Sequence, residues 1–213
     1  MKEMKLSELL EKIIEDPNAH AKWLNTLSMM ENVGARKIAR FEDAVTVNTS
    51  ILKHASEEAR HAYILKRMIP KTGVSGYDTY EDQFLFVPQT SRHYLHSLDV
   101  FAARYLKDKL GLKGYDLRYM AYLLVTYAIE MRADELYPIY EKVLKEKRTK
   151  YISVRPIIVE EEGHLEEMIN QLQSGLPNWE EHARVMTEFE IKLHTNWIEE
   201  VGNEVLNKVG EIA

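Results

Sequence analysis

The sequence predicts an all-α protein, and three observations lead to this fold class. Apolar residues recur three and four positions apart along most of the chain, which is the period of an amphipathic helix. Alternating patterns typical of strands are almost missing. With 213 residues, of which 45% are hydrophobic and 29% charged, the chain is long enough and apolar enough to bury a core. We therefore expect a single helical domain over residues 1–213.

The predicted helices follow one another in order, separated by residues that start or end helices. An amphipathic helix leads the chain, and Asp16 and Pro17 then supply a cap and a first-turn proline for the next helix. Pro70 ends the third helix. Core helices are expected at about 17–41, 44–69, 116–147 and 154–173, with additional N-terminal, crossover and C-terminal helices at about 5–15, 91–110 and 179–209.

Glycine and proline mark the connections between these helices. Residues 71–91 form the one long irregular connection that the sequence predicts, and we expect it to cross the bundle. The glycines within 111–114 separate the crossover helix from the long helix that follows, in which Pro138 is predicted to produce a kink. Gly175 and Pro177 end the next helix.

Composition excludes several classes of function. The net charge is −6 and no basic run is present, so nucleic acid is not expected as a partner. The absence of Cys excludes disulfides, thiolate nucleophiles and Cys-ligated zinc or iron–sulfur sites. The N-terminal segment 1–17 is amphipathic and acidic, unlike a signal peptide, and the longest apolar stretch, 120–129, is too short to cross a bilayer. We expect a cytoplasmic protein without a membrane partner.

Two Glu-x-x-His pairs, Glu58/His61 and Glu161/His164, are the first candidates for a functional site. On a helix this spacing places both side chains on one face. A chain with this many Glu and His residues contains such a pair by chance, so the surroundings decide. Both pairs lie within an apolar stripe at helical spacing. The stripe positions are Ile51, Ala55, Ala62 and Leu65 for the first pair and Val154, Ile157, Ile158, Leu165 and Met168 for the second.

The helix before each pair also carries one carboxylate on its apolar face. These residues are Glu31 and Glu130. Burying an unpaired carboxylate costs several kcal/mol, so four of them in one bundle require cations or protons as partners. Two divalent metal ions would balance the four charges, and two neutral imidazoles would complete the ligand set. The predicted metal ligands are Glu31, Glu58, His61, Glu130, Glu161 and His164.

A weak internal repeat supports this interpretation. Glu31 and Glu130 are 99 positions apart, while Glu58 and Glu161, like His61 and His164, are 103 apart. A helix pair that bears a Glu and a Glu-x-x-His motif therefore occurs twice. This is the ligand arrangement of di-iron and di-manganese carboxylate bundles.

On these motifs the chain resembles the ferritin-like di-iron carboxylate superfamily, in its bacterioferritin, rubrerythrin and oxygenase branches. The resemblance covers about 17–69 and 116–173 and implies a ferritin-like four-helix bundle with additional N-terminal, crossover and C-terminal helices. It implies that Glu31 and Glu130 are terminal or bridging ligands, that Glu58 and Glu161 are bridging, and that two imidazoles bind as well. It leaves open which carboxylates bridge.

The chain departs from some members of this superfamily. Storage ferritins lack the second full Glu-x-x-His motif, and rubrerythrins carry a Cys-rich rubredoxin part that a chain without Cys cannot have. The separation of 27 positions between Glu31 and Glu58, together with the inserted helix at 91–110, is more similar to oxygenase-type members such as the aldehyde-deformylating oxygenases.

The resemblance implies a non-haem di-iron oxidase or oxygenase with two Fe, or alternatively Mn or mixed Mn/Fe. Its expected partners are O2, a small organic substrate and an external electron donor. The alternatives are a ferroxidase that stores iron in an oligomeric shell, a peroxide-reducing protein similar to rubrerythrin or manganese catalase, and a metal-free helical adaptor. Separately, the C-terminal helix carries an apolar stripe that is expected either to cap the bundle or to form the face of a homodimer. The stripe comprises Trp179, Val185, Phe189, Leu193, Trp197 and Val201.

Several neighbours of the ligands have more than one interpretation. The four carboxylates are the catalytic candidates. His54 could be an extra ligand, a hydrogen-bond partner of a ligand or a satisfied core histidine, and Tyr127 could relay an electron, form a radical or serve in packing. Thr126 could hydrogen-bond a metal-bound oxygen species or its own helix, and Asp134 could orient a ligand imidazole or pair with an Arg. Gly34 could open a channel beside Glu31 or allow close helix packing. The remaining neighbouring acids, expected to be solvated, are Glu57, Glu160 and Glu162.

Overall fold

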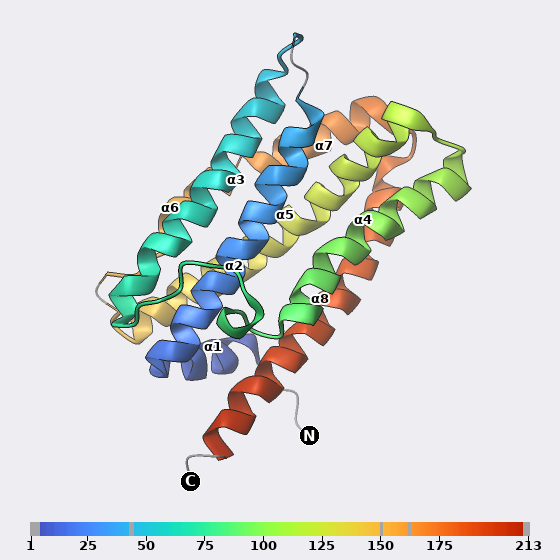
Figure 1. Cartoon of the computed structure of the whole chain (residues 1–213). Coiled ribbons are helices and arrows are strands. Elements are labelled where there is room, and N and C mark those ends of the chain that lie inside the picture. Colours follow the sequence, from blue (N-terminus) through green and yellow to red (C-terminus); the bar gives the residue numbers. More distant parts are fainter. Residues whose placement is uncertain (1–4, 43–44, 150, 162, 211–213) are drawn as a thin grey trace.

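The computed structural model describes residues 5–42, 45–149, 151–161 and 163–210, and within them every regular element is helical, which confirms the all-α prediction. Figure 1 shows these elements. The α-helices are α1 (Leu6–Glu15), α2 (Pro17–Ile38), α3 (Thr49–Met68), α4 (Pro88–Leu110), α5 (Gly114–Glu146), α6 (Arg155–Glu161), α7 (His164–Gly175) and α8 (Trp179–Gly210). Short 3-10 turns occur at η1 (Ala39–Phe41), η2 (Ile69–Thr72) and η3 (Asp82–Phe84).

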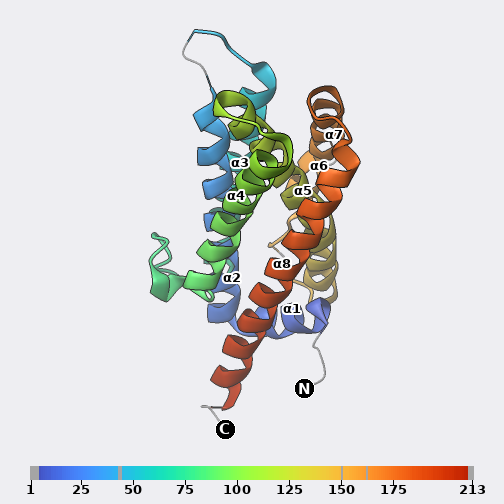
Figure 2. The ribbon, with the colours of Figure 1, turned by 90° about the vertical axis from the view of Figure 1, so that its right-hand side faces the viewer.

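α5 is the helix with the most α-helical neighbours, and the α2–α3 pair lies at one edge of the molecule. α2 and α3 are neighbours along their length, while α5 packs against α6 and α7 on one side and against α4 and α8 on another (Figures 1 and 2). α1 covers one end of the bundle, and α8 projects beyond that end. This arrangement is compatible with a ferritin-like bundle of α2, α3, α5 and α6–α7 to which α1, α4 and α8 are added.

Side-chain caps fix where α2 and α3 begin. Asp16 accepts a hydrogen bond from the backbone N–H of Asn18 at 2.9 Å, and Pro17 occupies the first turn of α2. Asn48 accepts from the N–H of Ser50 at 3.1 Å, so α3 begins after this cap and not near residue 44. Residues 43 and 44 lie outside the described part of the chain. Each such cap contributes about 1 kcal/mol.

The crossover helix begins earlier than the sequence indicated. α4 starts at Pro88, inside the segment predicted to be irregular, because proline lacks only an N–H that has no helical partner in the first turn. Val87, just before it, has a φ of 34° and donates its N–H to Glu204 Oε2 at 3.0 Å. Gly111, with a φ of 67°, ends the helix in the left-handed conformation that glycine adopts without strain.

The prediction of one continuous helix over 154–173 was wrong. α6 ends at Glu161 and α7 begins at His164, with Gly163 before it. Glycine inside a helix costs about 1 kcal/mol relative to alanine, which favours a break at this position. Residue 162 lies outside the described part. Glu161 Oε2 and His164 Nδ1 lie 2.9 Å apart across this boundary between α6 and α7.

A polar layer lies between apolar clusters in the middle of the bundle. In α5, Ala128 belongs to the cluster around α4 and α7, whereas Leu136 belongs to the cluster around α1, and Glu130 lies between them. Likewise, Ile157 of α6 belongs to the cluster around α1, and Met168 of α7 belongs to the cluster around α4 and α7. Each fully buried large aliphatic side chain contributes about 1.5–3 kcal/mol, so these clusters hold the polar layer in place.

The C-terminal apolar stripe packs against the bundle. Trp197 of α8 stacks on Trp23 of α2, with ring centroids 5.5 Å apart, and donates its indole N–H to Ser91 at 2.9 Å. Val201 is fully buried. These residues cap the bundle within the chain.

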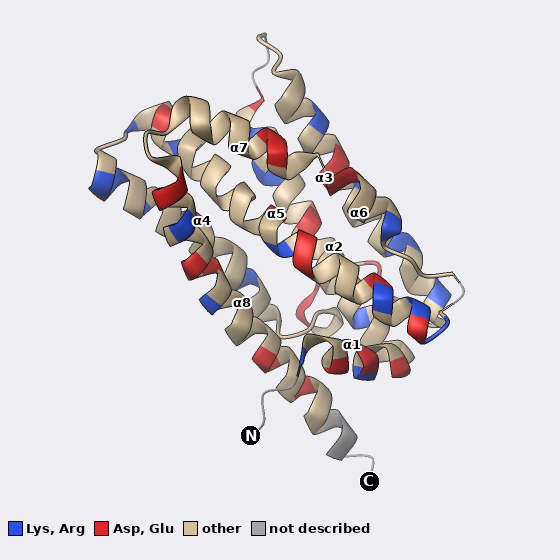
Figure 3. Ribbon diagram, turned by 180° about the vertical axis from the view of Figure 1, so that it is seen from behind, with Lys and Arg blue, Asp and Glu red and all other residues tan. Residues whose placement is uncertain are grey.

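On the outer faces, acidic and basic residues are interspersed and form no single basic stripe on the side that Figure 3 shows. Among the described helices, none combines the length and the apolar character needed to cross a bilayer.

Candidate metal centre

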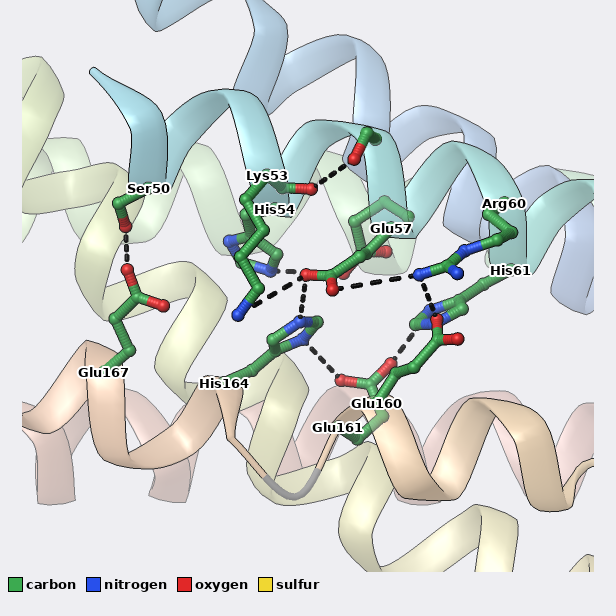
Figure 4. Close-up of polar contacts among 12 residues, drawn as sticks. Ser50, Lys53, His54, Glu57, Arg60, His61, Glu160, Glu161, His164 and Glu167 are labelled. Atoms are coloured by element: carbon green, nitrogen blue, oxygen red, sulfur yellow. Dashed lines mark hydrogen bonds and ion pairs between the residues drawn. The ribbon is translucent and has the colours of Figure 1, made fainter.

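The polar layer is a cluster of carboxylates and imidazoles from five helices, and Figure 4 shows the part of it that α3, α6 and α7 contribute. All six predicted ligands reach it: Glu31 from α2, Glu58 and His61 from α3, Glu130 from α5, Glu161 from α6 and His164 from α7. His61 and His164 have relative exposures of 0% and 1%. The cluster is therefore deeply enclosed.

The donor atoms form two groups that could each hold a metal ion, and in each group the atoms lie within 4.8 Å of one another. Glu58 belongs to both groups. The first group contains His54, Glu58, Glu130 and His164, and the second contains Glu31, Glu58 and His61.

Glu161 lies between the two predicted imidazole ligands. Its Oε1 is 3.0 Å from Nδ1 of His61, and its Oε2 is 2.9 Å from Nδ1 of His164. It therefore contacts both halves of the internal repeat at once. Neither of the two donor groups includes Glu161.

His54 belongs to the cluster itself. Its Nε2 lies 3.0 Å from Glu130 Oε1 and 3.3 Å from Glu58 Oε1, and its Nδ1 is 3.3 Å from the hydroxyl of Tyr122. The sequence signal is its position one helical turn before Glu58. His54 is therefore a candidate ligand as well as a neighbour of the ligands.

Two carboxylates outside the donor groups orient the imidazoles. Glu57 Oε2 lies 2.8 Å from Nε2 of His164, and Glu160 Oε2 lies 2.9 Å from Nε2 of His61. Each imidazole thus has its Nδ1 towards the cluster and its Nε2 on a carboxylate, an arrangement that fixes the tautomer of a metal-bound histidine. The expectation that Glu57 and Glu160 are solvated was wrong. Glu162 lies outside the described residues.

These two contacts are reciprocal between the halves of the repeat. Glu57 and Glu160 are 103 positions apart, the same interval that separates the two Glu-x-x-His motifs. The Glu of each half holds the imidazole of the other half. Arg60 joins the two carboxylates from outside, with Nη2 2.7 Å from Glu160 Oε2 and 3.8 Å from Glu57 Oε1.

The other predicted neighbours lie in different surroundings. Thr126 is buried and lines a cavity beside the cluster. Tyr127 packs edge-to-face on Trp179, with ring centroids 6.1 Å apart, and Asp134 is exposed. The tyrosine that contacts a predicted ligand is Tyr137, which donates its hydroxyl to Glu31 Oε1. Its place two turns along α5 from Glu130 is a signal that sequence reasoning did not use.

Burial and mutual repulsion raise the pKa values of three carboxyl groups. Burial and then the neighbouring Glu58 raise the pKa of Glu31 well above its usual range. Burial and Glu161 raise the pKa of Glu58 to about 7, and burial with the contact to Glu161 raises that of Glu130 to about 8. Without metal, protons therefore take the place of cations in the cluster.

The opposite shifts occur at the centre of the network. Burial acts to lower the pKa of His164, but contacts with Glu130 and Glu161 outweigh it and raise the pKa to about 11. Burial acts to raise the pKa of Glu161, but contacts with Glu130 and with both imidazoles outweigh it and lower that pKa strongly. Glu161 is thus the carboxylate that stays ionised.

The donor set fits hard or borderline divalent cations. Carboxylate oxygens and imidazole nitrogens are the ligands that Fe and Mn accept, and no described Lys or Arg forms an ion pair with the four inner carboxylates. In addition, Nδ1 of His61 is buried without a hydrogen bond, although it lies 3.0 Å from Glu161 Oε1. A buried nitrogen in this state is available to bind a metal.

A cavity of about 920 Å³ adjoins the cluster, and the side chains of Glu58 and Glu130 form part of its wall. It lies between α2–α3 on one side and α4–α5 on the other. A small molecule in this cavity would touch both donor carboxylates of the first metal group.

Comparisons with protein-family models, with curated proteins and with solved structures find no match to this chain. The fold and the site define an all-helical protein with a buried Glu/His cluster that could bind metal, compatible with a ferritin-like fold.

Proposed function

We propose that this protein is a non-haem di-iron oxidase or oxygenase that uses O2 to oxidise a small organic substrate. The observation that supports this most directly is the pair of buried donor groups that share Glu58 beside a cavity. Groups of three and four protein donors leave coordination positions for other ligands. Two iron ions bound there would supply electrons and Lewis acidity for O2 chemistry.

The residues of the chain would hold and orient this centre. Glu57 and Glu160 keep His164 and His61 in the tautomer that presents Nδ1 to the cluster. Tyr137 holds Glu31 through its hydroxyl, and so restricts the position of one terminal carboxylate. The apolar clusters pack on both sides of the polar layer and hold its side chains in place.

The cavity favours an organic substrate over iron storage as the purpose of the centre. A storage centre needs a path for ions, whereas this cavity has Ile51 and Val125 as buried apolar walls next to Glu58. Such a wall binds a hydrocarbon surface. The electrons needed beyond those of two irons would come from an external donor.

Metal content and O2 uptake test this proposal together. The chain would be loaded with Fe(II) without air, exposed to O2 in an oxygen-electrode cell and desalted before elemental analysis. We expect about two irons per chain and O2 uptake that depends on them. Glu58→Ala should lose both, while Glu167→Gln, a carboxylate near the cluster but in neither donor group, should retain both.

The other outcomes would replace the proposal. Tens of irons per chain in a large oligomer would indicate storage, and rapid turnover of H2O2 without an organic substrate would indicate peroxide reduction. A wild-type chain that retains neither Fe nor Mn would exclude a metal centre.

A further inference from the structure

The cavity beside the metal centre continues to the surface of the molecule. At its inner end lie Glu58 and Glu130, which are buried, and at its outer end lie Arg40, Tyr115 and Arg118, which are exposed. Its volume of about 920 Å³ is in the range of pockets that bind small organic molecules. The cavity is therefore a route from solvent to the donor carboxylates.

The chemistry of the wall changes along this route. Apart from Thr126 and the two carboxylates at the inner end, the buried part of the wall is aliphatic and comprises Ile38, Ile51, Ala121 and Val125. The exposed part is polar, with Thr46 and Asn48 beside the arginines. A ligand that matches both parts has an apolar body and a polar head.

Glycine keeps the inner end of the cavity open. A Cβ atom at Gly34 would lie 3.3 Å from Glu58 Oε2, closer than most such contacts in proteins. A side chain at this position would therefore crowd the shared ligand and reduce the space next to it. This favours the channel interpretation of Gly34 that the sequence left open.

The charges at the rim are not balanced. Lys37 is paired with Asp99 at 2.6 Å and is not available to a ligand. Arg40 and Arg118 form no ion pair within the described residues, and Glu42 is the one further carboxylate among the residues that line the cavity rim. Two guanidinium groups against one carboxylate leave positive charge where the polar head of a ligand would lie.

We propose that this cavity binds the substrate of the metal centre and that the substrate is an amphipathic carboxylate. Its head would contact Arg40 and Arg118, whose planar guanidinium groups match a carboxylate in shape and charge. Its apolar body would lie between Ile51 and Val125, and its far end would reach the donor carboxylates. That the ligand is a substrate rests on the proposed function, but binding of a ligand in this cavity can be tested independently of that function.

Octanoate and 1-octanol are suitable probes because they share an apolar body and differ in charge. Their binding to the full-length chain would be measured by calorimetry, with and without Co(II) in the metal centre. We expect octanoate to bind about tenfold more tightly than 1-octanol, since a guanidinium–carboxylate pair replaces a neutral contact. Both ligands should shift the absorption bands of the bound Co(II).

Three variants locate the ligand. Combined Arg40→Gln and Arg118→Gln should lower the octanoate affinity about tenfold and leave that of 1-octanol unchanged. Val125→Trp should abolish binding of both probes by filling the cavity, with Ala121→Phe as a milder filling variant and circular dichroism to verify the fold. Arg36→Gln, an exposed arginine of α2 outside the cavity lining, is the matched control.

Each contrary result has a distinct meaning. Equal affinities of the wild type for the two probes would overturn the anionic head, and so would an octanoate preference that survives the double arginine variant. Unchanged binding in both filling variants would overturn the cavity as the site. A chain that binds octanoate but no Fe or Mn would refute the proposed function alone, whereas a chain with two irons and O2 uptake but no probe binding would refute this inference alone.

Discussion

Two of the regions that bury carboxylates, the Glu190 site and the Glu/His cluster, do so in opposite ways. Glu190 of α8 has a relative exposure of 1%, yet it is fully paired within the chain. Arg132 donates to it twice, from Nε at 3.0 Å and from Nη2 at 2.7 Å, and Tyr94 donates its hydroxyl at 2.7 Å. The chain itself supplies the cation at this site.

Within the part of the chain that the structure describes, the Glu/His cluster lacks a Lys or Arg partner, and its own cations are imidazolium groups, because contacts with Glu130 and Glu161 raise the pKa of His164 to about 11. Its four inner carboxylates face imidazoles, Tyr137 and one another, and within the described residues no Lys or Arg forms an ion pair with them. Burial is the first cause that raises the pKa of Glu58 to about 7 and that of Glu130 to about 8, so without metal these two carboxyl groups take up protons more readily than exposed ones. Burial of a carboxylate alone therefore does not mark a functional site, whereas several buried carboxylates that share imidazoles and have no Lys or Arg partner are a stronger indication of one.

The strongest test of this difference is metal loading. We expect Mn(II), or Fe(II) without air, to stabilise the wild type by about 4 kcal/mol for each site at a metal concentration 1,000 times the dissociation constant. Thermal unfolding with and without metal measures this gain. Glu161→Ala should lose most of the gain, while a Glu190→Gln variant should retain it. If metal does not change the unfolding temperature, the proposed difference between the Glu/His cluster and the Glu190 site is contradicted.

Removal of Arg132, the cation that pairs with Glu190, should lower the unfolding free energy by almost as much. Arg132→Met leaves Glu190 buried without its partner, and we expect a loss of about 3–5 kcal/mol in unfolding free energy. Urea denaturation measures it. The double variant Arg132→Met with Glu190→Gln should recover much of the loss, because it removes the unpaired charge as well. A loss below about 1 kcal/mol would mean that the pair is not essential to this region.

The free energy of unfolding should depend on pH through His194, which lies beside the Glu190–Arg132 pair. Burial and then Arg132 lower its pKa to about 3, below the value of about 6.5 expected in the unfolded chain. As the pH falls, the unfolded state takes up a proton first, so stability present above pH 6.5 is lost below it. We expect His194 to account for about 2 kcal/mol between pH 6.5 and 5. His194→Leu should flatten the pH profile of urea unfolding by that amount, and an unchanged profile would refute the assignment.

The smallest expected effect concerns the carboxylates that orient the imidazoles. Glu57→Gln and Glu160→Gln should each weaken metal binding about tenfold, or about 1.4 kcal/mol, because the imidazoles lose their charged partners. Competition with a chelator of known affinity measures this change. Glu167→Gln, in which the carboxylate contacts Ser50, is the matched control. Equal effects of all three variants would indicate a general charge effect and not a specific contact.

The helical fold and the position of the six predicted ligands follow from periodicity, because each ligand lies within an apolar stripe whose direction is fixed by the helix. Glu57 and Glu160 escaped this reasoning. They lie one position, about 100° of helix rotation, away from Glu58 and Glu161, and only the packing of α3 against α6 and α7 makes that direction face an imidazole.

Other features depend on distances between helices that no single-helix pattern contains. The contact of Tyr137 with Glu31 joins α5 to α2, and the cavity arises where four helices leave space. Glu190 is the opposite case, a buried carboxylate that is not part of the cluster. Its apolar surroundings in the sequence resemble those of Glu31, but its partner Arg132 is 58 positions away. The break at Gly163 could have been anticipated from helix propensity alone.

The reciprocal contacts of Glu57 with His164 and of Glu160 with His61 also bear on how the chain folds. They join positions 107 and 99 residues apart, so they form only after both helix pairs have docked. Closing such long loops is entropically costly, which places this network late on the folding pathway. Metal held by the completed network would then slow unfolding more than it speeds folding. Bound metal would therefore stabilise the folded chain kinetically once both halves of the internal repeat are assembled.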